Sequence, residues 1–109
     1  MLIKKEMGHI DFSKSADEIG RLVRGMNPWP SAFTFLDGKQ LKIWKAKPVK
    51  EENGEGAPGE VIKVYKDRFT VKTGSGLIDI FELQSEGKKR MSSKDFLLSG
   101  RIKEGTILG

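Results

Sequence analysis

The N-terminal part of the chain has apolar residues at every third or fourth position, which predicts a helix with one buried stripe. The stripe consists of Ile19, Leu22, Val23 and Met26. Ser15 and Glu18 have the spacing of a capping box, so the helix should begin directly after Ser15. It should end near Gly25, because residues 27–30, Asn-Pro-Trp-Pro, are unable to continue it.

From residue 31 onward the apolar period becomes two, which is typical of β-strands separated by tight turns. The expected strands are 32–36, 39–49, 60–66, 68–73 and 77–83. In the second of these the alternation slips near Ile43 and Trp44, which predicts a β-bulge. Residues 50–59 have no apolar periodicity and should form a solvated loop.

A short second helix is expected near the end of the chain. It should begin at 92–93, bury Phe96 and Leu97, and end at Gly100. Residues 101–108 then form a tail. The fold class is therefore mainly β, a small five-stranded barrel, either closed or half-open, with one N-terminal helix and a short C-terminal helix.

The composition is basic and restricts the possible partners. Lys and Arg number 20 against 15 Asp and Glu, giving a net charge of +5, which favours polyanions. No stretch approaches the ~18 apolar residues of a membrane span, so we expect no membrane partner. The chain lacks cysteine and has one histidine, His9, so we expect neither a metal site nor a catalytic residue.

The second expected strand carries a series of lysines without a carboxylate. They are Lys39, Lys42, Lys45 and Lys47, followed by Lys50. Such a stripe can follow a phosphate backbone, but it also suits a solvated edge strand that lysines protect from aggregation. Trp44 lies among them and could stack on a base, although packing in the core is the more common role of tryptophan.

A second group of cations follows the last strand and consists of Lys88, Lys89 and Arg90. A loop can present all three to one backbone, and the N–H groups of the helix beginning at 92–93 would add an anion site. A charged turn without a partner is the alternative. Arg101 and Lys103 would extend the group if the tail folds back.

Several segments resemble, in order, the C-terminal domain of methionyl-tRNA formyltransferases. Segments 10–16, Ile-Asp-Phe-Ser-Lys-Ser-Ala, and 24–30, Arg-Gly-Met-Asn-Pro-Trp-Pro, resemble its beginning. Segments 41–46, Leu-Lys-Ile-Trp-Lys-Ala, and 82–91, Glu-Leu-Gln-Ser-Glu-Gly-Lys-Lys-Arg-Met, resemble its later part, and 105–108, Gly-Thr-Ile-Leu, its end.

The resemblance implies an OB-like domain over residues 13–109, preceded by a linker segment at 1–12. In the family this domain follows a catalytic formyltransferase domain, and the pair formylates methionyl initiator tRNA from 10-formyltetrahydrofolate in cytoplasmic translation initiation. The C-terminal domain presents a positive surface to the tRNA. The catalytic Asn, His and Asp of the family have no counterpart here, so we expect the chain to bind no cofactor and to catalyse nothing alone.

The expected partners are therefore tRNA and the catalytic formyltransferase domain. The candidate tRNA-binding residues are Lys39, Lys42, Lys45, Lys47, Lys88, Lys89, Arg90, Arg101 and Lys103. Two alternatives stay open. Similar barrels follow formyltransferases that act on sugar nucleotides and share the Pro-Trp-Pro segment. The apolar helix stripe could also make the chain a structural interaction platform that binds no RNA.

Overall fold

The computed structural model of this chain describes residues 5–27, 31–49 and 55–109. Residues 28–30 of the Asn-Pro-Trp-Pro segment, and Lys50, lie outside the described residues. The elements are η1 (Lys5–Gly8), α1 (Ala16–Met26), β1 (Ala32–Leu36), β2 (Lys39–Val49), β3 (Val61–Val64), β4 (Phe69–Lys72), β5 (Leu77–Ser85), β6 (Met91–Ser92) and α2 (Ser93–Leu97). The mainly β class with one N-terminal and one short C-terminal helix is confirmed.

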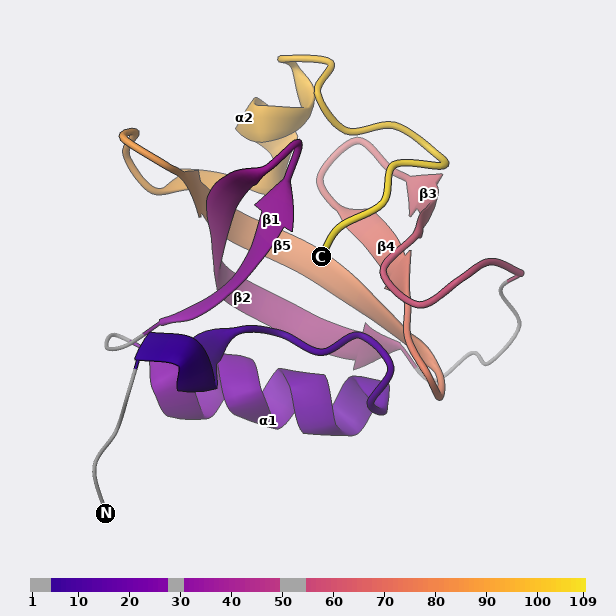
Figure 1. Ribbon diagram of the computed structural model, residues 1–109. Helices are drawn as coiled ribbons and strands as arrows, with labels where there is room; N and C mark the ends of the chain where they lie inside the picture. Colours follow the sequence, from indigo (N-terminus) through magenta and orange to yellow (C-terminus); the bar gives the residue numbers. More distant parts are fainter. Residues whose placement is uncertain (1–4, 28–30, 50–54) are drawn as a thin grey trace.

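The six strands form one antiparallel sheet in the order β1-β2-β5-β4-β3, and β6 pairs with β5. The sheet curves but does not close into a barrel, because β1 and β3 are its two edges. The helix α1 lies beneath the sheet and α2 above it (Figure 1). The sequence did not predict β6, because two residues are too few to show an alternation.

The predicted beginning and end of the first helix are confirmed by its hydrogen bonds. The Ser15 hydroxyl accepts from the backbone N–H of Glu18 at 3.2 Å, and Oε1 of Glu18 accepts from the backbone N–H of Ser15 at 3.4 Å. At the other end Nδ2 of Asn27 donates to the carbonyl oxygen of Val23 at 2.8 Å, so an asparagine closes the last turn.

The predicted irregularity in β2 is also confirmed. The pairing of β2 with β5 shifts register between Ile43 and Lys45, and again between Lys45 and Ala46. The shift keeps Leu41, Ile43 and Ala46 on the buried side of the strand, although their spacing departs from two. Trp44 and Lys45 consequently both lie on the outer side.

The two edges of the sheet are covered by segments from both ends of the chain, and we call this region the seam (residues 9–12 and 105–109). Segment 9–12 begins with a parallel bridge to β1. In the tail, the N–H of Leu108 donates to the carbonyl oxygen of Gly59 beside β3 at 2.8 Å. The N–H of Gly109 donates to the carbonyl oxygen of Phe35 in β1 at 3.0 Å. The seam therefore connects the edges that the strands leave unpaired.

Candidate nucleic-acid interface

The side chains of three of the predicted lysines project from β2 on the side that faces away from the core. They are Lys42, which is half-buried, and Lys45 and Lys47, which are exposed. Lys39 has the same parity as the buried Leu41 and lies at the turn between β1 and β2, so it does not share this outer face.

Two arginines on the same outer face form ion pairs with carboxylates of the protein. Nη2 of Arg90 lies 2.7 Å from Oε1 of Glu82, and Nε of Arg68 lies 3.0 Å from Oδ2 of Asp79. Partial burial lowers the pKa of Arg68, but hydrogen bonds to Asp67 and Asp79 outweigh this effect and raise the pKa above its ordinary value. Within the described part of the chain the lysines of β2 form no ion pair, so their charges are not neutralised by the protein.

Trp44 lies on this outer face and is half-buried. It does not belong to the core, although packing in the core is the more common role of tryptophan. Its Nε1 donates to Oε1 of Gln84 at 2.9 Å, and Nε2 of Gln84 donates to the carbonyl oxygen of Lys88 at 2.9 Å. The guanidinium carbon of Arg90 lies 4.7 Å from the centroid of the indole ring. These contacts connect β2 to the turn between β5 and β6.

Phe81 and Tyr65 add two further partly exposed rings that the sequence did not single out. The Nζ atoms of Lys45 and Lys47 each lie 5.9 Å from the centroid of the Phe81 ring. The guanidinium carbon of Arg68 lies 4.2 Å from the Tyr65 centroid and 5.9 Å from that of Phe81. Rings and cations at such distances attract each other. The aromatic–cation row, as we name it, consists of Tyr65, Arg68, Phe81, Lys45, Lys47, Trp44 and Arg90.

The cations of the β5–β6 turn adjoin the aromatic–cation row, and the start of α2 beside them is already capped by a side chain. Lys88 and Lys89 are exposed, and the N–H of Lys88 closes the turn on the carbonyl oxygen of Ser85 at 3.0 Å. The helix α2 has only five residues, and the Ser92 hydroxyl already accepts from the N–H of Asp95 at 3.1 Å. A carboxylate in the first turn further disfavours an anion there.

The tail places its two cations in different surroundings. Nη1 of Arg101 lies 3.4 Å from the hydroxyl of Ser85, so this arginine lies at the end of β5 from which the turn departs. Lys103 belongs to a tight turn of the tail beside β3, where the N–H of Gly105 donates to the carbonyl oxygen of Val61 at 2.8 Å. The tail therefore brings Arg101 toward the turn cations and leaves Lys103 at another edge of the sheet.

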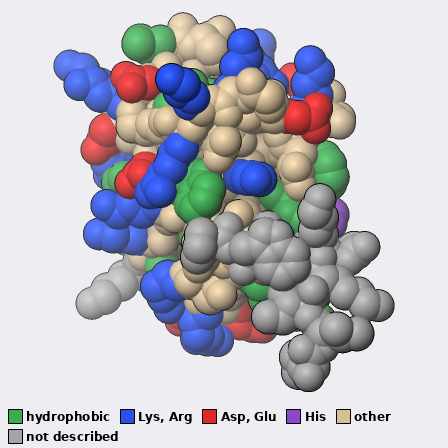
Figure 2. Space-filling model, turned by 90° about the vertical axis from the view of Figure 1, so that its left-hand side faces the viewer, with side chains coloured by type: hydrophobic (Ala, Val, Ile, Leu, Met, Phe, Trp, Pro, Cys, Tyr) green, Lys and Arg blue, Asp and Glu red, His purple; other side chains and the backbone are tan. Residues whose placement is uncertain are grey.

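Figure 2 shows the side of the molecule on which the β5–β6 turn projects. Lys and Arg side chains are spread over much of this side and outnumber the Asp and Glu side chains between them. The described surface is thus predominantly positive here, but the carboxylates are not segregated from it.

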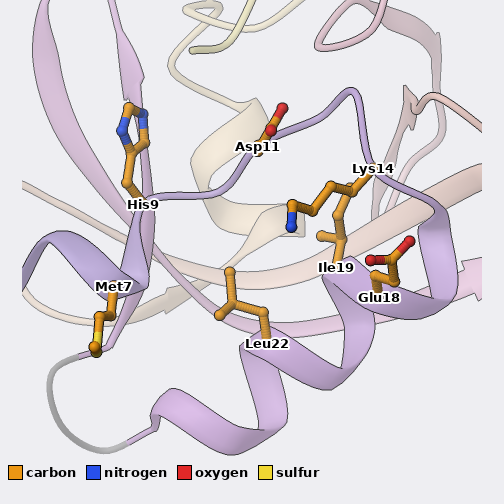
Figure 3. A pocket seen from close by; sticks show the side chains of 7 residues that line it. All are labelled: Met7, His9, Asp11, Lys14, Glu18, Ile19 and Leu22. Atoms are coloured by element: carbon orange, nitrogen blue, oxygen red, sulfur yellow. The ribbon is translucent and has the colours of Figure 1, made fainter. Parts of the chain in front are cut away.

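A hollow lies between the N-terminal segment and α1 (Figure 3). Met7, His9, Asp11, Lys14, Glu18, Ile19 and Leu22 line it. The ring of His9 stacks on Phe33 with centroids 5.2 Å apart. Both signs of charge meet in this hollow, so it is not suited to a polyanion.

Most of the apolar stripe of α1 is buried in the core of the domain itself. Ile19 and Val23 are 2% and 1% exposed, and Leu22 and Met26 are half-buried. An interaction platform would need this stripe to be exposed. The part of the stripe that still borders a hollow is the apolar side of the hollow in Figure 3. In the described residues no three His, Asp or Glu are grouped to hold a metal ion, and no helix has the length and apolarity to cross a membrane.

Comparison with known protein families shows to which family this chain belongs. The model of the formyl transferase C-terminal domain matches residues 2–101. The chain belongs to the formyl transferase C-terminal domain family. Related members of the family include the methionyl-tRNA formyltransferases of Lachnospira eligens, 46% identical, and of Geotalea uraniireducens, 51% identical, each over 99% of this chain.

This formyl transferase C-terminal domain spans about a third of the length of those relatives, 36% and 34% respectively. Among solved structures it resembles part of HypX from Aquifex aeolicus, crystallised in complex with tetrahydrofolic acid. That likeness has a TM-score of 0.74 at 20% identity and covers 93% of this chain and 18% of HypX. At this identity the likeness concerns the fold.

Proposed function

We propose that this chain is the tRNA-binding part of a methionyl-tRNA formyltransferase and that it holds the tRNA by its phosphates. The observation that carries the proposal is the set of β2 lysines, Lys42, Lys45 and Lys47, which share one outer face and have no carboxylate partner in the described part of the chain. The name of the relatives favours tRNA over a sugar nucleotide as the substrate.

Binding follows from the chemistry of these cations. Each lysine that neutralises a phosphate releases condensed counterions, so affinity falls as salt rises. Lys88 and Lys89 extend the positive surface along the strand direction, whereas Arg90 must exchange Glu82 for a phosphate before it can contribute. Phosphate contacts position an RNA without reading its bases, so selection of initiator tRNA is assigned to the remainder of the protein.

In this proposal the formylation reaction takes place in a domain other than this chain. A catalytic formyltransferase domain of the same cytoplasmic protein would bind 10-formyltetrahydrofolate and formylate the methionyl amino group. This chain would raise the local concentration of the tRNA and orient its acceptor end toward that domain.

A salt titration of initiator tRNA binding tests the proposal. A Lys45→Gln/Lys47→Gln double variant should lower the slope of log K against log salt by roughly two units, about one per phosphate contact. The matched control is Lys14→Gln/Arg21→Gln, which removes the same charge from exposed cations that are not among the candidate tRNA-binding residues. The control should leave the slope near that of the unaltered chain.

Two outcomes contradict the proposal. Equal slopes for the two double variants would mean that net charge alone, and not the face of β2, determines binding. A tRNA affinity too weak to measure even at low salt would leave the chain without an RNA-binding role.

A further inference from the structure

The backbone of β5 changes its neighbour at Phe81. On one edge of β5, Ile80 pairs with Phe69 of β4, whereas Glu82 pairs with Ser92 of β6. Phe81 lies between these two partners and has no paired residue on either strand. On the opposite edge the bulge of β2 falls at the same place. The sheet therefore has a local gap with an aromatic ring at its centre.

This gap forms an open hollow on the outer face, which we call the Phe81 hollow. Its apolar part comes from the half-buried side chains of Phe81 and Met91, and cations from three different elements surround it. The cations are Lys45 of β2, Arg90 of the turn and Lys94 of α2. The hydroxyl of Ser92 and several carboxylates complete the rim.

We propose that the Phe81 hollow binds one unpaired nucleobase of an RNA strand held on the aromatic–cation row, an inference that rests on the proposed function. A base is planar and uncharged and carries a π-face, which suits the ring of Phe81 and the thioether of Met91. The phosphates on either side of that base are within the reach of lysines on both sides of the hollow. The domain then distinguishes looped or single-stranded RNA from a continuous duplex.

The charges around the hollow favour a base of a strand over a free anion. Three carboxylates, those of Asp67, Glu82 and Asp95, line it beside the cations and would repel a phosphate placed within it. A base has no charge to be repelled, while the phosphates on its two sides lie at the margin of the hollow, which carries Lys45 of β2 and Lys94 of α2. In a duplex both faces of every base are stacked, so a duplex can use the lysines but not the ring of Phe81.

The experiment compares three fluorescein-labelled RNA probes with the 109-residue chain. The probes are an oligouridine, the same oligouridine with abasic sites at its centre, and a duplex with an equal number of phosphates. Base–aromatic stacking changes affinity by about 5-fold or more. We therefore expect the unaltered chain to bind the oligouridine about 5-fold or more tightly than the abasic strand, and Phe81→Leu to abolish that difference.

The salt dependence separates stacking from phosphate binding. Phe81→Leu should weaken oligouridine binding with an unchanged salt slope and leave duplex binding unchanged, whereas Phe81→Tyr should retain the preference. The matched control is Phe35→Leu, which alters a half-buried ring of β1 that lies beside His9 and outside the aromatic–cation row.

The comparison of abasic and complete strands uses the unaltered protein, so it remains decisive even if Phe81→Leu fails to fold. Equal affinity for the two strands, with binding still dependent on salt, overturns the base site and leaves the proposed function intact. Absence of binding to all three probes and to tRNA overturns both.

Discussion

The guanidinium group of Arg90 lies over the indole ring of Trp44, with its central carbon 4.7 Å from the ring centroid. Arg90 comes from the β5–β6 turn and Trp44 from β2, so this contact joins the two groups of cations that are separate in the sequence. The same guanidinium also forms an ion pair with Glu82, which holds part of its charge away from any ligand.

Removal of the Glu82 carboxylate should strengthen RNA binding. In Glu82→Gln the amide keeps the size of the side chain and can still accept from Arg90, but a negative charge leaves the aromatic–cation row. We expect tRNA affinity to rise roughly 2- to 5-fold, which corresponds to about 0.5–1 kcal/mol for one partly exposed charge. Fluorescence anisotropy at low salt measures this change.

The control for this variant is Glu104→Gln, which makes the same change of charge on an exposed residue of the tail turn. It should raise the affinity less. If Glu82→Gln binds tRNA more weakly than the unaltered chain, the ion pair orders Arg90 for binding instead of competing with it.

The seam should contribute measurably to stability through one side chain of the tail. Leu108 is 3% exposed and its neighbour Ile107 is 57% exposed. Leu108→Ala should lower the free energy of unfolding by about 2–4 kcal/mol, because it leaves a cavity in the core. Ile107→Ala, the adjacent control, should change it by about 0.5 kcal/mol or less. Urea denaturation distinguishes the two, and equal losses would mean that the tail is not packed as described.

Stability should fall in mild acid because two carboxylates form hydrogen bonds in the folded state. The hydroxyl and backbone N–H of Ser13 lower the pKa of Asp11 below its ordinary value of 3.8. The hydroxyl and backbone N–H of Ser15 lower the pKa of Glu18 below 4.5. A carboxylate with a lowered pKa stabilises the fold above its unfolded pKa, and this contribution is lost as pH falls through the folded value.

Urea unfolding of Ser15→Ala at several pH values tests this assignment. At neutral pH the variant should lose about 1 kcal/mol, because the first turn of α1 loses its cap. Below the ordinary pKa of Glu18 the difference between the variant and the unaltered chain should shrink, since protonation removes much of the same interaction. A difference that stays constant across this pH range would contradict the role of Glu18 in the cap.

The parts of the fold that depend on local pattern could be predicted from the sequence. The bounds of β1 and β2 follow from the alternation on either side of Asp37 and Gly38, which both adopt the positive φ of a tight hairpin turn. The bulge of β2 is visible because buried and exposed parities exchange at Trp44. These features need no information from elsewhere in the chain.

The candidate site could be predicted only in part, because strands that are far apart in the sequence must pair before their side chains share one face. Both parities of β5 are apolar, with Leu77 and Ile78 each buried, so the alternation does not reveal that Phe81 faces outward. The lysines of β2 were found from their density, whereas Arg68 reaches the same face only through the pairing of β4 with β5. The separation of Arg101 from Lys103 likewise depends on the path of the tail.

The seam has a consequence for how this protein behaves beside other copies of itself. A sheet whose outermost strands offer free backbone groups can hydrogen-bond to a neighbouring molecule and begin an aggregate. In this domain residues 9–12 and 105–109 occupy that position along β1 and β3. Loss of residues 105–109 would therefore favour self-association of otherwise folded molecules, so the seam, as well as the net charge, keeps copies of this domain apart.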